Sequence, residues 1–213
     1  MRLLQMQPTP QTGKLRLLFD NDAVLKVPPY LAADFGLYAG LELTEQEMEA
    51  LRQAARKASA KERAVHIVSA SGVSEQELRK RLVQKGEDSA DAAQAVDWLK
   101  ELNLLDDRQT ASQIVSSAVR KGYGRSRIKN LLYEKGIPRE YWEEALGEIP
   151  DQSDAIDRFL SQKLDGREPD EKAIKKATDA LLRRGHSWTD IQNALRRYHA
   201  DCEPEPDFEP EDF

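Results

Sequence analysis

The sequence predicts an all-α protein of tandem three-helix, helix-turn-helix-like repeats behind a small N-terminal β-hairpin module. A recurring spacing is the main observation: the positions six and ten residues after Gly72, Gly122 and Gly185 are all apolar, namely Leu78 and Leu82, Ile128 and Leu132, Ile191 and Leu195. Strand-favouring runs are also scarce beyond the N-terminus. Because each unit of a repeat protein packs mainly on its neighbours, we expect an elongated, curved stack.

Residues 1–57 are expected to form the N-terminal hairpin and helix module. Two short apolar runs, residues 14–19 and 23–27, flank the turn-forming group Asp20-Asn21-Asp22, which predicts a β-hairpin. Thr44 and Glu47 have the spacing of a capping box, so a helix should begin there. A lone hairpin is only marginally stable in water, and we therefore expect it to pack on residues 30–38 or on this helix.

Residues 58–105 are expected to form the first three-helix repeat. Gly72 should take a left-handed conformation and end its first helix, and Ser74 with Glu77 should cap the second. Lys85-Gly86 closes that helix, and residues 89–102 have the apolar periodicity of a third.

Residues 106–150 repeat this pattern as the second three-helix unit. Gly122 should end the first helix, Gly124 tolerates the dihedral angles of an N-cap, and Lys135-Gly136 closes the second helix. Pro138 fits the first turn of a third helix over residues 138–146. The pair Asp106-Asp107 is interpreted as a helix cap, because nothing nearby completes an acid–base or metal site.

Residues 151–200 are expected to form the third repeat. A helix over residues 154–164 should pack on the second repeat or begin the third, and Pro169 should open the next helix. His199 stands where a closing glycine would be, so the third helix of this copy should be missing. Residues 201–213 contain seven acids and three prolines, which predicts a disordered acidic tail.

Three runs of the sequence resemble one protein family. LKELNLLDDRQTA, VRKGYGRSRIKNLLYEKGIP and LLRRGHSW are similar to the RecX regulatory proteins, and the resemblance extends over about residues 60–198. It implies a regulator of the bacterial recombinase RecA that lies in the groove of the RecA filament on single-stranded DNA. It also implies modulation, chiefly inhibition, of the recombinase, ATPase and coprotease activities in homologous recombination, DNA repair and the SOS response.

The charge distribution supports a binding role. The net charge is −6, but the seven acids after residue 200 exceed it, so residues 1–200 carry a net charge of +1. Bases outnumber acids most strongly between residues 120 and 140. Candidate contacts with DNA or the filament are Lys121, Tyr123, Arg125, Arg127, Lys129, Arg139, Lys175, Lys176, Arg183, Arg184, Arg196 and Arg197, with Arg79, Lys80, Arg81 and Lys85 as secondary candidates.

Two other interpretations of these bases stay open. They could serve a nucleic-acid-binding protein that acts without a recombinase, or they could be solvated helix faces of a scaffold. Double-stranded DNA is also a candidate ligand, but three copies with different exposed residues argue against a single sequence-specific recognition helix. Trp188 is interpreted as a packing residue in preference to a base-stacking platform.

Nothing in the sequence points to an enzyme. We find no phosphate-binding loop, dinucleotide fingerprint or nucleophile elbow, so we expect no catalytic residues and no cofactor. His66, His186 and His199 lack the spacing of a metal site, and the single Cys202 cannot form an internal disulfide. With no signal peptide and no membrane-spanning run, we expect a cytoplasmic monomer.

Overall fold

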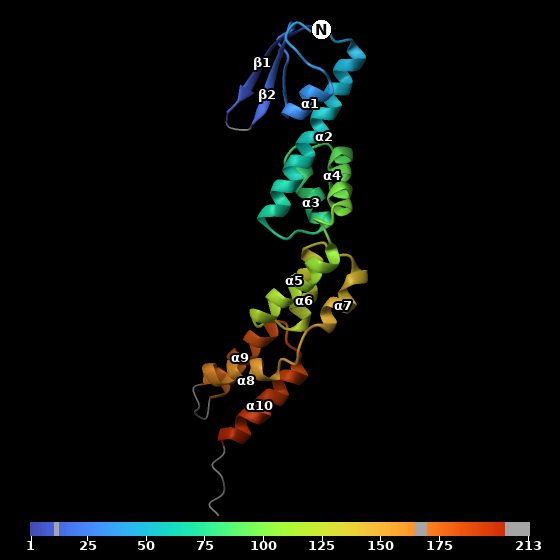
Figure 1. Cartoon of the computed structure of the whole chain (residues 1–213). Coiled ribbons are helices and arrows are strands. Elements are labelled where there is room, and N and C mark those ends of the chain that lie inside the picture. The colour runs from blue at the N-terminus through green and yellow to red at the C-terminus, as the bar shows by residue number, and fades with distance from the viewer. Residues whose placement is uncertain (11–12, 165–169, 203–213) are drawn as a thin grey trace, which may run out of the picture. The chain divides into compact units, whose positions relative to one another are not determined.

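The computed structural model describes residues 1–10, 13–164 and 170–202, with the backbone alone for residues 199–202. The chain divides into an N-terminal unit, Met1–Asp106, and a C-terminal unit, Asp107–Phe213. Figure 1 labels strands β1 and β2 and the α-helices of both units. After residue 27, every regular element that the structure describes is a helix. The predicted helical fold with a small N-terminal β module is therefore confirmed.

The N-terminal module is a three-stranded antiparallel sheet in the order β1-β2-β3. The predicted hairpin is confirmed: β2 (Lys14–Phe19) pairs with β3 (Val24–Val27), and Asp22 takes a left-handed conformation in the turn between them. A further strand, β1 (Leu3–Thr9), pairs with β2 and was not predicted. Its sequence signal is weak because only Leu3 of its seven residues is buried.

A short helix, α1 (Pro29–Asp34), and a long one, α2 (Glu45–Ala70), follow the sheet. The predicted capping box opens α2: the hydroxyl of Thr44 accepts from the amide of Glu47, and the carboxylate of Glu47 accepts from the amide of Thr44. The hydrogen bonds that the carboxylate of Glu47 accepts from the amide and the hydroxyl of Thr44 lower its pKa. The capping box therefore fixes the point at which the chain leaves the sheet module and turns into α2.

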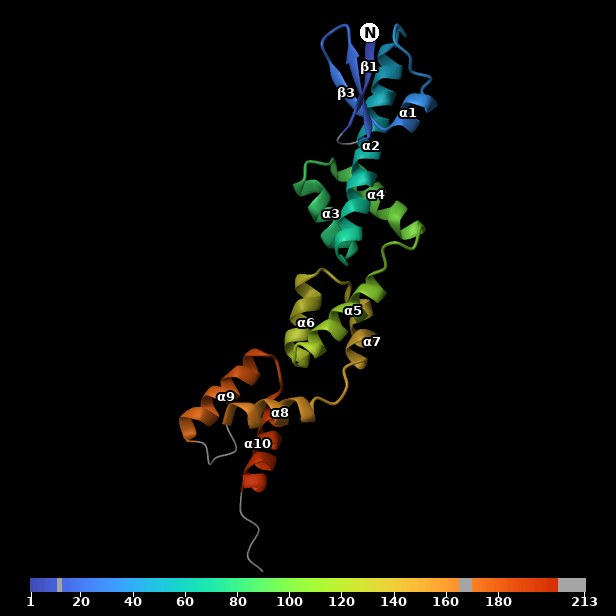
Figure 2. The same cartoon turned by 60° about the vertical axis from the view of Figure 1, so that its left-hand side comes forward.

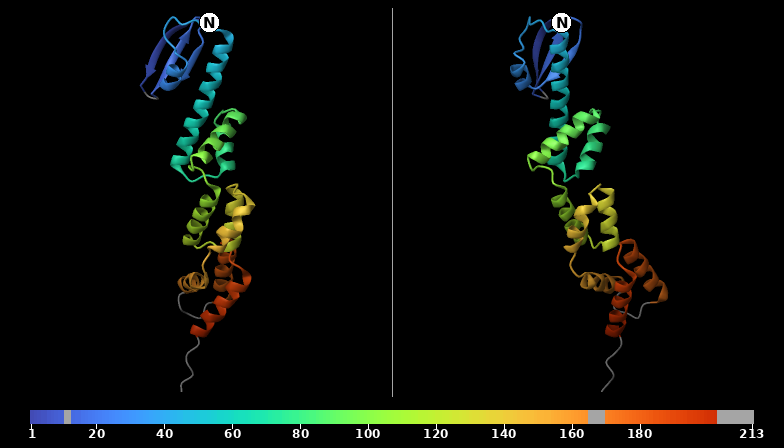
Figure 3. Two further views of the ribbon diagram at one scale, coloured as in Figure 1. Left: turned by 45° about the vertical axis from the view of Figure 1, so that its right-hand side comes forward. Right: turned by 90° about the vertical axis from the view of Figure 1, so that its right-hand side faces the viewer.

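α2 contributes to two separate cores without interruption. Its first half, through Ala58, packs against the sheet and α1, and its second half, from Ala60, packs in the first repeat. Figure 3 shows the strands lying along the N-terminal half of α2. The predicted division between residues 57 and 58 thus falls inside one helix, at the point where its buried side changes partners.

The first repeat combines the second half of α2 with α3 (Glu75–Gln84) and α4 (Ser89–Glu101). The hydroxyl of Ser74 accepts from the amide of Glu77, as predicted, and Gly86 ends α3 in a left-handed conformation. The prediction for Gly72 is wrong, because its φ is not positive. α2 ends at Ala70, and the extended chain that follows places Val73 in the core, with 2% of it exposed.

The second repeat begins the C-terminal unit with α5 (Asp107–Arg120) and α6 (Arg125–Glu134). Left-handed Gly122 and Gly136 end these two helices, as predicted. The predicted third helix is present but divided into a 3₁₀ turn, η1 (Arg139–Tyr141), and a short helix, α7 (Trp142–Gly147). Pro138 lies at the N-cap of η1 and not within a helical turn.

The third repeat consists of α8 (Ser153–Leu164), α9 (Glu171–Arg183) and α10 (Trp188–Cys202). Ile156 and Leu160 of α8 share a core with Leu181 and Ile191, so α8 begins the third repeat (Figure 2). In the first two repeats the additional helix follows the two helices that flank the glycine turn. In the third repeat the additional helix, α8, precedes them. The tail was predicted to begin at residue 201, but α10 continues to Cys202, so this boundary is wrong by two residues. The rest of the tail, residues 203–213, and the start predicted at Pro169 lie outside the described residues; α9 has Asp170 as its N-cap.

Candidate functional site

The glycine turns of the second and third repeats contact each other through their backbones. The amide of Gly124 donates to the carbonyl of Arg184 at 2.8 Å, and the amide of Ser126 donates to the carbonyl of Gly185 at 3.1 Å. We call residues 121–126 and 183–188 the joint. It brings together two parts of the chain that lie about sixty residues apart in the sequence, both of which belong to the C-terminal unit.

Two glycines make this close approach possible. A Cβ atom on Gly124 would lie 2.3 Å from the carbonyl oxygen of Gly185, and one on Gly185 would lie 2.3 Å from the amide nitrogen of Arg127. Gly185 also has a φ of +86°, which disfavours any other residue. No side chain fits at either position without displacing the backbone that it faces.

The joint replaces a side-chain cap on α6. Gly124 offers no side chain to cap the helix, and two carbonyls just beyond the end of α9 accept hydrogen bonds from amides at the start of α6. The negative end of one helix dipole therefore meets the positive end of another. The other two repeats are capped by Ser74 and Ser187. This contact was not predicted from the sequence, although the absence of serine at position 124 was its signal.

His186 forms the third link of the joint. Its Nε2 lies 3.1 Å from the carbonyl oxygen of Gly122. A carbonyl can only accept, so Nε2 carries the hydrogen. Burial lowers the pKa of His186, and the charge of Arg184 lowers it further, whereas the hydrogen bond to Gly122 and the charge of Asp190 raise it. The buried ring therefore favours its neutral form as a fixed link between the repeats.

The solvent side of the joint is basic. Lys121 and Arg183 are exposed, and the guanidinium of Arg184 lies 4.8 Å from the centre of the Phe159 ring. Trp188 is 54% exposed, so its predicted packing role is wrong. The inward positions of α10 belong instead to Ile191 and Ala194. Two bases and a large aromatic ring are thus available to a ligand.

Several candidates near α6 also have structural roles. Nη1 of Arg125 donates to the carbonyl of Leu146 at 3.0 Å, and Arg127 forms an ion pair with Glu134. The guanidinium of Arg139 lies over Trp142, and Tyr123 packs against the core of the second repeat. Lys129, by contrast, is exposed on α6. Arg125 and Arg139 are exposed as well, so their contacts and not their exposure distinguish them from Lys121 and Lys129.

The remaining candidates divide in the same way. Arg197 makes two hydrogen bonds to the carboxylate of Asp157, at 2.8 and 3.0 Å, which raise its pKa, and Arg81 pairs with Glu77 within α3. Arg197 is exposed despite this pairing, as are Lys175, Lys176 and Arg196 in the third repeat and Arg79, Lys80 and Lys85 in the first. Sequence spacing could not separate candidates with an intramolecular partner from the others, because both kinds occupy similar outward positions on their helices.

Two further findings concern the residues that the structure describes. Among them, no three His, Cys, Asp or Glu side chains gather as a metal ion would require. None of their helices combines the length and apolar character that crossing a bilayer demands.

The fold and the joint define the chain as a helical-repeat protein with a basic, solvent-facing surface. Two stretches identify the particular family: residues 60–99 match the family model for the first three-helix domain of RecX, and residues 106–146 match the one for the second. A regulatory protein RecX from Shigella dysenteriae is 35% identical over 149 residues, covering 64% of this chain and 90% of that protein. The chain therefore belongs to the RecX family of regulatory proteins.

Other relatives extend the match to more of the chain. A regulatory protein RecX from Clostridioides difficile is 26% identical over 189 residues, covering 86% of this chain and 89% of that protein. The crystal structure of a regulatory protein RecX aligns with a TM-score of 0.68 at 19% identity, covering 92% and 98% of the two chains. RecX from Lactobacillus salivarius aligns at 0.59 and 19%, covering 69% and 99%. These structures establish the fold.

Proposed function

We propose that this chain regulates a RecA recombinase by binding the filament that the recombinase forms on single-stranded DNA. It acts in the cytoplasm as a monomer, without catalysis, and it lowers the recombinase, ATPase and coprotease activities during DNA repair and the SOS response. Membership of a family of regulatory proteins supports this proposal, since the relatives carry that name.

The joint is the observation that carries the proposal. Its exposed cations, Lys121 and Arg183, come from two repeats that backbone hydrogen bonds hold together. Because these bonds fix the turns, little conformational entropy is lost when a ligand binds. Ammonium and guanidinium groups form strong hydrogen bonds to phosphate oxygens, and an exposed ring such as Trp188 can stack on a base. The joint thus suits a single-stranded nucleic acid.

A competing explanation for the bases follows from their positions. Lys121 follows the C-terminal end of α5, and Arg183 lies in the last turn of α9, where cations stabilise a helix dipole. This stabilisation does not require a ligand. Only the dependence of binding on salt separates the two explanations.

The first experiment measures this dependence by fluorescence anisotropy with labelled single-stranded DNA. Lys121→Gln with Arg183→Gln should weaken binding and reduce the slope of log K against log salt by about 1.4, since each phosphate contact on a single strand contributes about 0.7. The matched control is Arg16→Gln with Lys26→Gln. It removes two exposed positive charges from residues that lie opposite each other on strands β2 and β3. An unchanged slope in the joint variant would assign its bases to the helix ends alone.

The second experiment tests the recombinase directly. DNA-dependent ATP hydrolysis by the cognate recombinase should fall when the wild-type chain is added, and the joint variant should need a higher concentration for the same effect. Binding to single-stranded DNA with no effect on hydrolysis would favour the alternative, a nucleic-acid-binding protein independent of a recombinase.

A further inference from the structure

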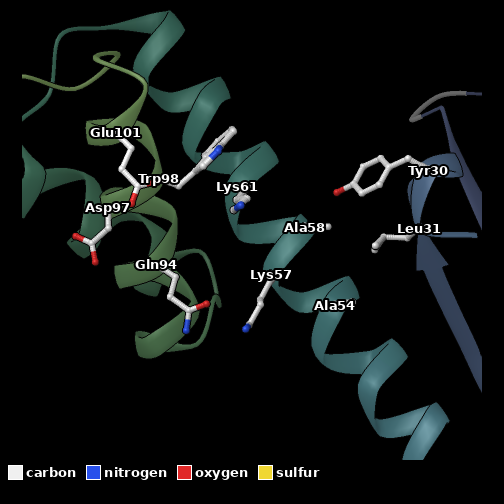
Figure 4. Close-up of a pocket in the computed structure, with 10 residues that line it drawn as sticks. All are labelled: Tyr30, Leu31, Ala54, Lys57, Ala58, Lys61, Gln94, Asp97, Trp98 and Glu101. Carbon is white, nitrogen blue, oxygen red and sulfur yellow. The ribbon is translucent and has the colours of Figure 1, made fainter. Parts of the chain in front are cut away.

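The N-terminal unit has a groove that the proposed nucleic-acid contact does not use. It has a volume of about 520 Å³ and follows α2 between α1 and α4 (Figure 4). Ala54 and Ala58 form its floor, where short side chains leave the space open. Tyr30 on α1 and Trp98 on α4 form its walls, and the ring of Tyr30, 56% exposed, projects toward α2. We call this the α2 groove.

The α2 groove continues along the helix beyond these residues. A second hollow of about 420 Å³ shares Tyr30, Ala58 and Trp98 with it and extends to Val65, which is 37% exposed. Ala54, Ala58 and Val65 therefore form a strip of about three helical turns, with Lys61 between Ala58 and Val65. An open strip of this length suits an extended or helical segment better than a compact small molecule.

Side chains of opposite charge line the α2 groove. Lys57 and Lys61 lie one turn apart on α2, and Nζ of Lys61 sits 4.7 Å from the centre of the Trp98 ring. Asp97 and Glu101 lie one turn apart on α4, and both are exposed. A nucleic-acid backbone attracted by the lysines would meet these carboxylates, so the charge pattern disfavours it. A segment with charges of both signs would complement both the lysines and the carboxylates.

We propose that the α2 groove binds a segment of a protein partner. The segment places an apolar side chain between Tyr30 and Trp98, an acidic side chain toward the lysines of α2 and a basic one toward the carboxylates of α4. Aromatic side chains often provide most of the binding energy at protein interfaces, and the opposed charges set the direction of the segment. The partner is a recombinase protomer, an identification that rests on the proposed function.

The experiment compares two double variants with matched chemistry. Tyr30→Ala with Lys57→Glu alters the α2 groove; Tyr38→Ala with Lys26→Glu makes the same changes at exposed sites that do not line it. Both are titrated against recombinase filaments preassembled on single-stranded DNA, and separately against the bare DNA. The groove variant should bind filaments at least tenfold more weakly and bare DNA within twofold of wild type, whereas the control should match wild type in both.

Folding is checked by circular dichroism and thermal unfolding. If the double variant is unfolded, Tyr30→Ala alone replaces it, since this ring is largely exposed, and it should weaken filament binding at least threefold.

Each remaining outcome contradicts the proposal in a different way. Wild-type filament binding by the groove variant would show that the α2 groove binds no recombinase. An equal loss of bare-DNA binding would make it a nucleic-acid site. Self-association of the wild type that the groove variant abolishes, with filament binding retained, would identify a second copy as the occupant. A wild-type chain that binds no filament would overturn the proposed function, and the named partner with it.

Discussion

The turn of the first repeat and the turn of the second perform the same task with different chemistry. In the first repeat, the hydroxyl of Ser74 caps α3 from within the same turn. In the second, Gly124 has no side chain to offer, and the carbonyls of Arg184 and Gly185 accept from the start of α6. The first cap is local, whereas the second depends on another repeat being folded.

This difference shows how a repeat protein can couple two of its units. A serine cap satisfies one or two amides and leaves the turn sterically independent. A glycine admits a neighbouring backbone, so the same amides are satisfied only when the third repeat is in place. The second and third repeats should consequently unfold together, and substitutions at the joint should affect both.

The largest expected effect distinguishes two left-handed glycines. Gly185→Ala should lower the free energy of unfolding of the C-terminal unit by about 3 kcal/mol, through a backbone overlap and an unfavourable φ. Gly86→Ala is the matched control: it has a φ of +91° with nothing within 4 Å of its Cβ, so only about 1 kcal/mol should be lost. Urea unfolding of both variants measures the contrast, and equal losses would mean that the joint is not tightly packed.

In the second prediction, a serine that would normally stabilise a helix N-terminus is expected to destabilise it. Gly124→Ser introduces the residue that the other repeats use as a cap, yet it should destabilise the C-terminal unit by about 2 kcal/mol, because its Cβ meets the carbonyl of Gly185. The reciprocal change, Ser74→Gly, should destabilise the first repeat, because it removes the buried hydroxyl that caps α3. A stabilising Gly124→Ser would show that α6 lacks its cap in solution.

The smallest expected effect depends on pH. The pKa of His186 is lowered in the folded chain, so the unfolded chain binds more protons just below pH 6.5, and stability should fall as the pH drops from 7 to 5. The slope cannot exceed about 1.4 kcal/mol per pH unit for one proton. This window lies above the range in which carboxylates such as Glu47 and Asp151 titrate, since the pKa of each is lowered.

Two histidine variants check the assignment. His186→Gln should flatten the pH dependence of the C-terminal unit, and His66→Gln, at an exposed position in α2, should leave it unchanged. Hydrogen exchange measured at pH 5 and 7 reports on the two units separately. A flat profile in the wild type would mean that His186 is not held neutral in the folded state.

The sequence predicted the elements that depend on local chemistry. Glycines 86, 122, 136 and 185 end helices, Thr44 and Ser74 begin them, and both follow from short-range hydrogen bonding. Gly72 was mispredicted because the burial of Val73, a tertiary effect, determines how the chain leaves α2. Strand β1 was missed for a similar reason, since pairing with β2 and not its own composition makes it a strand.

The candidate site was predictable only in part. The spacing of bases marked both halves of the joint, but nothing local to Lys121 or Arg183 indicates that their turns meet. The partners of two arginines could not be predicted from the sequence either. Asp157 lies forty residues from Arg197, and Leu146 lies twenty-one residues from Arg125. The α2 groove was invisible for the same reason, since Tyr30 and Trp98 approach it from separate helices.

The uninterrupted course of α2 has a consequence for how the N-terminal unit opens. A helix interior is costly to break, so fraying of the sheet module should spread into the first repeat through residues 54–64. Loosening of the first repeat should likewise spread into the sheet module. Amide hydrogens in this stretch should exchange only when the whole unit opens, and they should be among its slowest. Proteolysis within either core should therefore require the whole N-terminal unit to open, although the chain is built from repeats.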